Sequence, residues 1–306
     1  MTMTMTTTTT PTPTTTQATA SRVRPRTRKP PKPLRPLPEP YRLTWWTRPG
    51  QPTFDDVCDA LAFQHFILDE LLQPVRESQW RAPTPSARWR VADLLGQVIA
   101  SAEHVVQTAH ASQPRRRAPV LDALDWYQGS GSLSTLTVEQ ARAVAGSAPG
   151  ARFAELAELA ELARLHRVAA STAAAILRSG EPGLVLRGAA GGITLADYTV
   201  TRLVGAVVHG LDLADALGRP GRAHGPAVRL VGGYFAALGE RRGPAGSRSA
   251  PIALGTDGSL IALHAKRPAT IVPAISWIQA ATGRRPAGRL LPDSHQWLAD
   301  LLPLAT

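Results

Sequence analysis

The sequence has one cysteine, Cys58, among 306 residues, and only 5% of the chain is aromatic. A lone cysteine excludes an internal disulfide framework and fits a reducing compartment, so we predict a cytoplasmic protein with Cys58 in its core. No apolar run reaches about 18 residues, so no membrane-spanning helix is predicted. The N-terminus also lacks the charged-then-apolar order of a secretory signal.

The sequence also lacks several motifs that would define a function. It has no Walker A loop, no glycine motif for a dinucleotide, no Cys/His zinc-finger spacing and no G-x-S-x-G nucleophile elbow. Nucleotide-dependent enzymes, zinc-finger proteins and serine hydrolases of those types are therefore not indicated.

Positive charge is concentrated at the N-terminus. Residues 1–50 contain nine Arg or Lys against one acid, Glu39, and so carry eight of the eleven net positive charges. This segment is rich in Thr, Pro and Arg, which predicts a disordered tail. It could contact nucleic acid weakly, but no aromatic residue lies among the charges from Arg22 to Arg35 for base stacking, so a solubilising role is preferred.

Beyond residue 50, alanine and leucine dominate the apolar residues, which favours helices. Apolar spacing predicts four helices, which we place at Thr53 to Pro74 with Thr53 as cap, Trp89 to Ala109 with Ser86 as a nearby cap, Arg152 to Arg178, and Thr194 to Leu217. Residues 111–136 are expected to form a long connection with one short turn near Leu121 to Trp126, and a short amphipathic piece is expected at Val138 to Ala145. Residues 51–220 are therefore predicted to form a four-helix bundle.

The pattern changes after Pro220. A helix is predicted at Ala227 to Leu238, followed by a β-hairpin around Thr256, Asp257 and Gly258. A further strand at Ala269 to Val272 and helices at Pro273 to Thr282 and Asp293 to Leu301 complete the prediction. Residues 221–306 are thus expected to form a small α+β domain, and the whole protein is expected to be mainly α.

Three stretches carry a resemblance to a known family. They are Trp89-Arg-Val-Ala-Asp93-Leu-Leu-Gly-Gln97, Arg202-Leu-Val-Gly205-Ala-Val-Val-His209-Gly-Leu-Asp212-Leu, and Trp277-Ile-Gln-Ala-Ala-Thr-Gly283-Arg284-Arg285-Pro286. In their order and spacing they resemble the actinobacterial mycothiol-dependent maleylpyruvate isomerase family. The resemblance covers roughly residues 53 to 290 and implies a DinB-like four-helix bundle with a small C-terminal domain.

The resemblance implies a particular chemistry. The family motifs read W-T-V-R-D-L-L-A-H and R-x-x-E-x-x-x-H-G-x-D-L, and their two His and one Glu hold a divalent metal such as zinc. Glu and His four residues apart project from one helix face, and a facing helix supplies the third ligand. The metal lowers the pKa of the thiol of mycothiol, the cosubstrate, which then adds to a small unsaturated acid and is later expelled.

This chain departs from the family at two ligand positions. Gln97 replaces the first histidine and Gly205 replaces the glutamate, so His209 is the only family ligand that remains. An amide is a poor zinc ligand and glycine offers no side chain, so we do not expect this set to retain a metal. His104, Glu103 and His110 lie too far along the helix to replace the lost ligands, and we expect them at the surface or locally paired.

The other candidate residues have both functional and structural interpretations. His209 is either a remaining metal ligand or a partly buried histidine bonded to a neighbour such as Gln97. Asp212 is expected to pair with or orient His209 or Arg202, and Arg202 is expected to pair with a carboxylate. Which of Arg284 and Arg285 matches the family arginine that faces the substrate's carboxylates is left open. The candidate site residues are Arg284 and Arg285 for catalysis, Gln97, Arg202 and Asp212 for contacts with the cofactor, and His209 for a metal.

The sequence therefore leaves two functions open. One is a thiol-dependent isomerase or thiol transferase that uses mycothiol and a small acid. The other is a non-catalytic protein that binds a small molecule or a partner on the same bundle. Bundles of this kind often form homodimers, but the sequence does not fix the oligomeric state.

Overall fold

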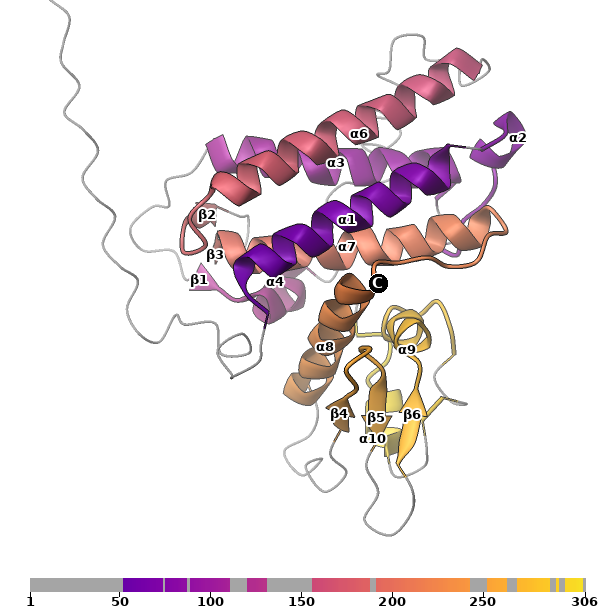
Figure 1. Cartoon of the computed structure of the whole chain (residues 1–306). Helices are drawn as coiled ribbons and strands as arrows, with labels where there is room; N and C mark the ends of the chain where they lie inside the picture. The colour runs from indigo at the N-terminus through magenta and orange to yellow at the C-terminus, as the bar shows by residue number, and fades with distance from the viewer. Residues whose placement is uncertain are drawn as a thin grey trace, which may run out of the picture. The chain divides into compact units, whose positions relative to one another are not determined.

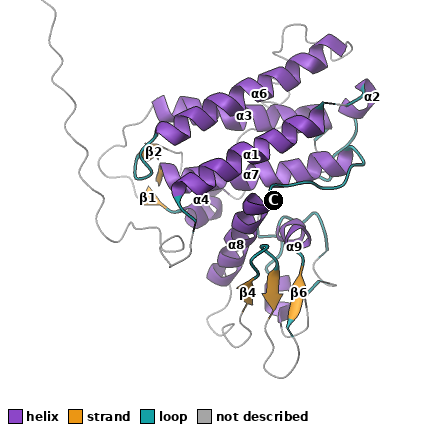
Figure 2. Cartoon of the chain, viewed as in Figure 1, coloured by secondary structure: helices purple, strands orange, loops and turns teal. Residues whose placement is uncertain are grey.

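The computed structural model describes residues 52–73, 75–86, 89–110, 120–130, 156–187, 191–242, 252–262, 269–286, 290–291 and 295–304. The predicted basic tail of residues 1–50 and the predicted amphipathic piece at Val138 to Ala145 lie outside these residues. Helix is the dominant structure in the described part of the chain (Figure 2).

Four long helices form a bundle. They are α1 (Phe54–Leu72), α3 (Val91–His110), α6 (Leu156–Ser179) and α7 (Leu195–Ala216). Helices α1 and α3 each pack against both α6 and α7, so α1 and α3 lie at opposite corners of the bundle (Figure 1). The fold is the expected DinB-like four-helix bundle, followed by small strands and helices.

The predicted caps explain where two of these helices begin. The Thr53 hydroxyl accepts a hydrogen bond from the Asp56 backbone N–H at 3.2 Å, while the Asp56 carboxylate accepts from the Thr53 N–H at 2.6 Å. Thr194 caps α7 by accepting from the Asp197 N–H at 3.1 Å. Such caps satisfy N–H groups that have no partner within the helix. Helix α3 begins differently from the prediction, because the Asp93 carboxylate, rather than Ser86, accepts from the Arg90 N–H at 3.0 Å.

The connections contain short elements that helical periodicity does not reveal. Helix α2 (Glu77–Trp80) follows α1, and α4 (Ala123–Ser130) lies in the predicted long connection. A three-stranded sheet forms with β3 (Gly192–Thr194) between β1 (Val120–Leu121) and β2 (Val185–Arg187). β1 pairs with β3 in parallel and β2 pairs with it in antiparallel fashion. Of these strands, only β2 has a signal in the sequence, the short apolar run Leu184-Val185-Leu186.

The C-terminal elements follow the predicted order. Helix α8 (Gly225–Arg242) precedes a sheet in which β5 (Leu260–Ala262) lies between β4 (Ile252–Leu254) and β6 (Thr270–Val272). β4 and β5 form the predicted hairpin, with Gly258 at a positive φ of 83° in its turn. Helices α9 (Ala274–Ala281) and α10 (Gln296–Ala299) follow. Because α8 contacts α1, α4 and α7 as well as α9 and β4, the domain boundary at residue 220 stays a prediction.

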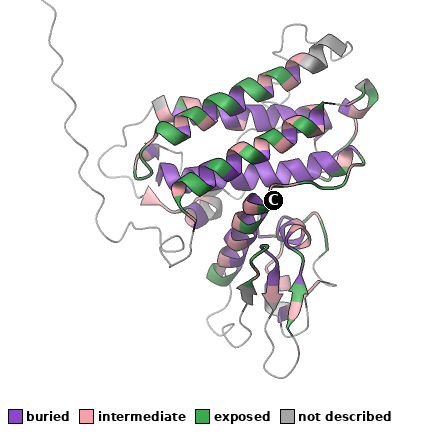
Figure 3. Cartoon of the chain, viewed as in Figure 1, coloured by how far each residue is buried: buried purple, intermediate pink, exposed green. Residues whose placement is uncertain are grey.

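Helix α7 is the most deeply buried part of the bundle. Every residue from Leu195 to Ala214 is buried, so no side of this segment faces solvent (Figure 3). Cys58 on α1 is also buried, with 2% of its surface exposed, as predicted. Among the helices described, none is both long and apolar enough to cross a membrane.

Candidate functional site

Two polar contacts set the register between α3 and α7. His104 Nδ1 lies 2.6 Å from the Tyr198 hydroxyl, and Arg202 Nη1 donates to the Ser101 hydroxyl at 3.2 Å. Residue numbers therefore fall along α3 as they rise along α7, which makes the two helices antiparallel. One turn further, this register sets Gln97 opposite Gly205. Gln97 is buried, with 1% of its surface exposed.

Beside Gly205 lies a small space, called the hollow below, that would hold a methyl group. A Cβ atom built on this glycine would meet nothing closer than the Cδ2 atom of His209, at 4.0 Å. That is an ordinary van der Waals distance, so a methyl group at position 205 would find room although the residue is buried. Position 205 therefore has unfilled space next to His209.

His209 is buried without a hydrogen-bond partner. Only 4% of its surface is exposed, and neither ring nitrogen has a partner among the residues that the structure describes. Burial, followed by the positive charges of Arg284 and Arg202, lowers the pKa of His209 to about 3. The ring is thus neutral near pH 7. The prediction of a hydrogen bond to a neighbour such as Gln97 is wrong, because both ring nitrogens of His209 lack a partner among the described residues.

Arg202 is a buried cation that contacts hydroxyl groups and an aromatic ring. Its Nε donates to the Thr201 hydroxyl at 3.2 Å, its Nη1 donates to Ser101, and its guanidinium carbon lies 4.8 Å from the centre of the Tyr198 ring. No carboxylate within the described ranges pairs with it, so the predicted ion pair is wrong. The ring face offers a cation–π contact in place of a carboxylate.

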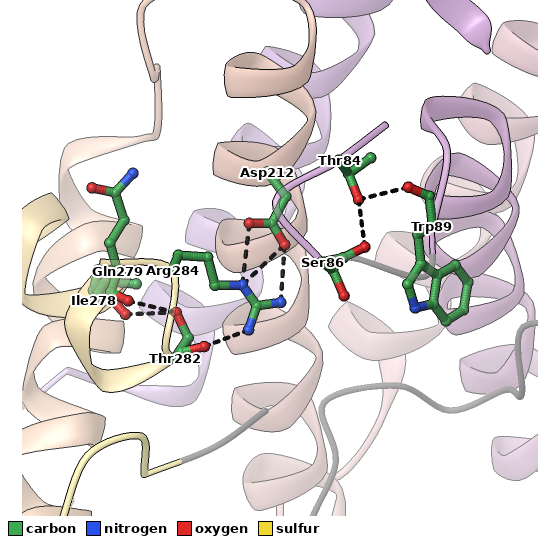
Figure 4. A network of polar contacts seen from close by, with 8 residues as sticks. All are labelled: Thr84, Ser86, Trp89, Asp212, Ile278, Gln279, Thr282 and Arg284. Atoms are coloured by element: carbon green, nitrogen blue, oxygen red, sulfur yellow. Dashed lines mark hydrogen bonds and ion pairs between the residues drawn. The ribbon is translucent and has the colours of Figure 1, made fainter. Parts of the chain in front are cut away.

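Asp212 pairs with an arginine from the C-terminal part of the chain. The Arg284 Nη2 donates to Asp212 Oδ2 at 3.0 Å, and Nε lies 3.2 Å from Oδ1 (Figure 4). The side chains are 2% and 11% exposed, so this is a buried bidentate ion pair. Burial raises the pKa of Asp212, while the charge and hydrogen bonds of Arg284 act in the opposite direction. The predicted partners, His209 and Arg202, are thus replaced by Arg284.

The end of α9 explains why Arg284 turns toward the bundle. Gly283 has a φ of 73°, a left-handed conformation that glycine adopts at low cost. Its N–H bonds to the Ala280 carbonyl, and the Arg284 N–H bonds to the Gln279 carbonyl at 2.8 Å, which is the Schellman pattern at a helix C-terminus. Arg284 Nη1 also donates to the Thr282 carbonyl at 2.6 Å.

Arg285 points elsewhere. It is exposed, and its Nη1 donates to the Ser276 hydroxyl at 3.0 Å. Of the two candidate catalytic arginines, Arg284 is thus the one whose charge acts on His209. Arg285 is a solvent-facing neighbour of α9.

The residues at this position do not fit a zinc ion. A zinc site needs at least three protein ligands, whereas Gln97, Gly205 and His209 supply one amide, no side chain and one imidazole. No group of three His, Cys, Asp or Glu side chains in the described part of the chain is arranged to hold a metal. His104 does not compensate, because it lies two turns further along α3 and contacts Tyr198. It is exposed and lies 3.2 Å from the Thr108 hydroxyl on its own helix, as expected of a surface or locally paired residue.

Two residues that contact Arg202, Ser101 and Tyr198, lie outside the sequence motifs. Ser101 and Tyr198 hold the guanidinium of Arg202, and Tyr198 is almost fully buried. Tyr198 and Ser101 lie four residues from Arg202 and Gln97 respectively, so helical spacing sets each on the same face as a known candidate. Identifying them requires the register between α3 and α7.

Two other cavities lie away from His209. One, of about 470 Å³, lies between α1 and α6 and includes His65 and His166, whose Nδ1 and Nε2 atoms are 3.1 Å apart. The other, of about 590 Å³, includes Phe63 stacked on His224 with ring centres 4.9 Å apart. Neither cavity is lined by Gly205 or His209.

A sequence profile described as the mycothiol maleylpyruvate isomerase N-terminal domain matches residues 61–214, half of the chain. The chain belongs to this family. The match includes α3 and α7, so it covers Gln97, Gly205 and His209. No curated protein and no solved structure matches the chain.

Proposed function

We propose that this member of the mycothiol maleylpyruvate isomerase family binds a small molecule between α3 and α7, without needing the metal of its relatives. The observation that carries the proposal is the hollow at Gly205 beside His209, whose buried ring nitrogens lack partners among the described residues. Unpaired buried polar groups cost free energy, and a bound molecule would satisfy them. The family suggests a low-molecular-weight thiol, mycothiol, and a small acid as ligands.

Binding is better supported than catalysis because the site has no strong means to activate a thiol. A free thiol has a pKa of roughly 8.5, whereas the pKa of His209 is about 3. A proton transfer from thiol to imidazole over that gap costs roughly 7 kcal/mol. The zinc that lowers the thiol pKa in the family does not fit the residues present.

Thiol-dependent isomerisation or thiol transfer is the second candidate. It is favoured by the two arginines, Arg202 and Arg284, whose charges act on the position of His209. Nearby cations lower the pKa of a thiol and could hold a thiolate without a metal. An assay of isomerase and thiol-transfer activity in the presence of EDTA separates this candidate from simple binding.

The test is calorimetric titration of the full chain with mycothiol, with and without EDTA, after the metal content has been measured by mass spectrometry. We expect substoichiometric zinc and the same affinity in both buffers. Binding that requires one zinc per chain would refute the proposal, as would a chain that binds no mycothiol in either buffer.

Three further predictions accompany this function. The single buried Cys58 supports a cytoplasmic location. A homodimer is expected by analogy with similar bundles, and light scattering would detect it. Weak nucleic-acid contact through residues 1–50 would appear as salt-dependent DNA binding that is lost when these residues are removed.

A further inference from the structure

Two histidines from different helices of the bundle meet away from His209. His65 lies on α1 and His166 lies on α6, and these helices pack side by side (Figure 1). The Nδ1 atom of His65 is 3.1 Å from the Nε2 atom of His166, and the ring centres are 5.3 Å apart. Both rings line the cavity of about 470 Å³ between the two helices.

The distance between these two ring nitrogens fits shared coordination of one metal ion. Zinc binds imidazole nitrogen at about 2.0–2.1 Å, so two such ligands at right or tetrahedral angles lie roughly 2.8–3.4 Å apart. The separation of His65 Nδ1 and His166 Nε2 falls within this range. Without a metal the same two atoms are joined by one proton in a hydrogen bond. A metal ion between them would take the place of that proton.

Both rings are in the neutral form that binds metals. Burial, followed by the interaction with the His166 ring, lowers the pKa of His65 to about 3. Burial also lowers the pKa of His166 to about 4, with the Asp69 charge acting against this shift and the Arg167 charge acting with it. Near pH 7 a metal ion therefore does not have to displace a proton from a charged ring.

Asp69 supplies a negative charge beside the pair. It lies one turn after His65 on α1 and lines the same cavity. Its carboxylate accepts hydrogen bonds from Nε and Nη2 of Arg167, both at 3.1 Å, and the arginine side chain is 55% exposed. An ion pair with so exposed an arginine contributes little to stability. The carboxylate of Asp69 thus remains available to offset the charge of a bound cation.

We propose that His65 and His166 form a binding site for a divalent late transition metal ion, with Cu²⁺ preferred over Ni²⁺ and Zn²⁺. The two imidazole nitrogens are the protein ligands, water completes the coordination, and Asp69 offsets part of the charge. Imidazole nitrogen selects these metals over Mg²⁺ and Ca²⁺, and Cu²⁺ binds most tightly in the Irving–Williams order. The site is separate from the one proposed at His209 and does not depend on it.

Two protein ligands predict weak and exchangeable binding. Zinc sites that retain their ion have three or four protein ligands. In addition, His166 Nδ1 has no partner among the described residues, so no acceptor there orients the ring from behind. The site should therefore be filled by added metal and emptied by dialysis. This agrees with the substoichiometric zinc expected in the purified chain.

The first test is calorimetric titration of the full chain with CuCl₂, NiCl₂ and MgCl₂. We expect Cu²⁺ and Ni²⁺ to bind saturably, Cu²⁺ more tightly, and Mg²⁺ not to bind. His65→Gln should raise the Kd for Ni²⁺ at least about tenfold, because one imidazole remains. An ion held by both rings joins α1 to α6, so Ni²⁺ should also raise the melting temperature of the unmodified chain but not of this variant.

His224→Gln is the matched control. It removes one imidazole from the other cavity, where His224 stacks on Phe63, and leaves His65 and His166 in place. This variant should bind Ni²⁺ with the Kd of the unmodified chain. The proposed site is overturned if the unmodified chain binds neither Cu²⁺ nor Ni²⁺, or if His65→Gln and His224→Gln give the same Kd.

A second test leaves both histidines in place. Arg167→Ala removes a positive charge and frees the carboxylate of Asp69, so it should lower the Kd for Ni²⁺ about threefold or more. Asp69→Asn removes the negative charge and should raise the Kd by a similar factor. A hydrogen-bonded histidine pair without a metal role would not respond in this way. Absent or opposite shifts in both variants would overturn the metal site.

Discussion

Asp212 and Arg284 are 72 residues apart in sequence, yet Arg284 Nη2 donates a hydrogen bond to Asp212 Oδ2 at 3.0 Å. The pair joins the bundle helix that carries His209 to the turn that ends α9 (Figure 4). Removing one member would leave the other charge buried and uncompensated. The pair is therefore the most sensitive polar contact at the site.

We expect Arg284→Ala to lower the free energy of unfolding by about 3–5 kcal/mol, as is typical when one partner of a buried ion pair is removed. Urea unfolding measures the change. Arg178→Ala is the control, because Arg178 pairs with Asp59 where both side chains are 52% and 59% exposed. That exposed pair should contribute less than about 1 kcal/mol. Equal losses in the two variants would contradict the buried pairing.

Gly205→Ala should stabilise the chain. Alanine is favoured over glycine within a helix by about 0.5–1 kcal/mol, and the added methyl finds space beside His209. In contrast, Gly232→Ala in α8 would bring its Cβ to 2.7 Å from the Gly258 carbonyl oxygen. We expect that variant to lose about 1–3 kcal/mol through overpacking. Urea unfolding of both variants decides the matter, and a destabilised Gly205→Ala would mean that the hollow is filled.

The chain should lose stability in acid through its buried histidines. Burial lowers the pKa of His166 to about 4, whereas an unfolded histidine has a pKa of about 6.5. As the pH falls below about 6.5 the unfolded chain binds a proton first, so this contribution to stability is complete above that pH and is lost toward pH 4. His166→Gln should reduce the stability lost between pH 7.5 and pH 4.5 by roughly 2–3 kcal/mol. An unchanged pH dependence in urea unfolding would argue against a buried neutral ring.

Restoring the family ligands should create a zinc site. The double variant Gln97→His/Gly205→Glu supplies two His and one Glu on facing helices, and we expect it to bind about one zinc per chain. The single variants and the unmodified chain should bind much less, as measured by mass spectrometry after dialysis. A double variant without zinc would show that Gln97 does not lie opposite Gly205.

The Cys58 thiol should be nearly inert in the folded chain. Burial raises its pKa to about 12, against roughly 8.5 for a free thiol, so the thiolate population at pH 8 falls roughly a thousandfold. Reaction with an aromatic disulfide reagent should therefore be slow in buffer and fast in urea. Rapid labelling without denaturant would contradict the burial of Cys58.

Local signals in the sequence were sufficient for much of the fold. The Thr53 and Thr194 caps, the helical apolar spacing and the hairpin around Gly258 depend on residues close together in the chain, and the structure confirms them. The two-residue strand β1 was not predicted, because it is defined by its parallel pairing with β3, 72 positions away. Short elements of this kind have no periodicity of their own.

The site was harder to predict than the fold. The family motifs located Gly205 and His209 correctly on one helix, but the partners of His209, Arg202 and Asp212 were all predicted wrongly. Those partners depend on the rotation and register of α3, α7 and the α9 turn, which local spacing does not fix. The pairing of Asp212 with Arg284 in particular needs the whole C-terminal part of the chain in place.

Helix α7 has no solvent-facing side from Leu195 to Ala214. The burial of one apolar face therefore cannot determine the rotation of this helix about its own axis. Its angular setting must come from directional contacts instead. Three hydrogen-bonded contacts lie along its length: the cap at Thr194, the bond from Arg202 to Ser101, and the ion pair of Asp212 with Arg284. These three contacts fix the rotation of α7 and so the direction in which His209 leaves the helix. The ring itself has no hydrogen bond to its described neighbours.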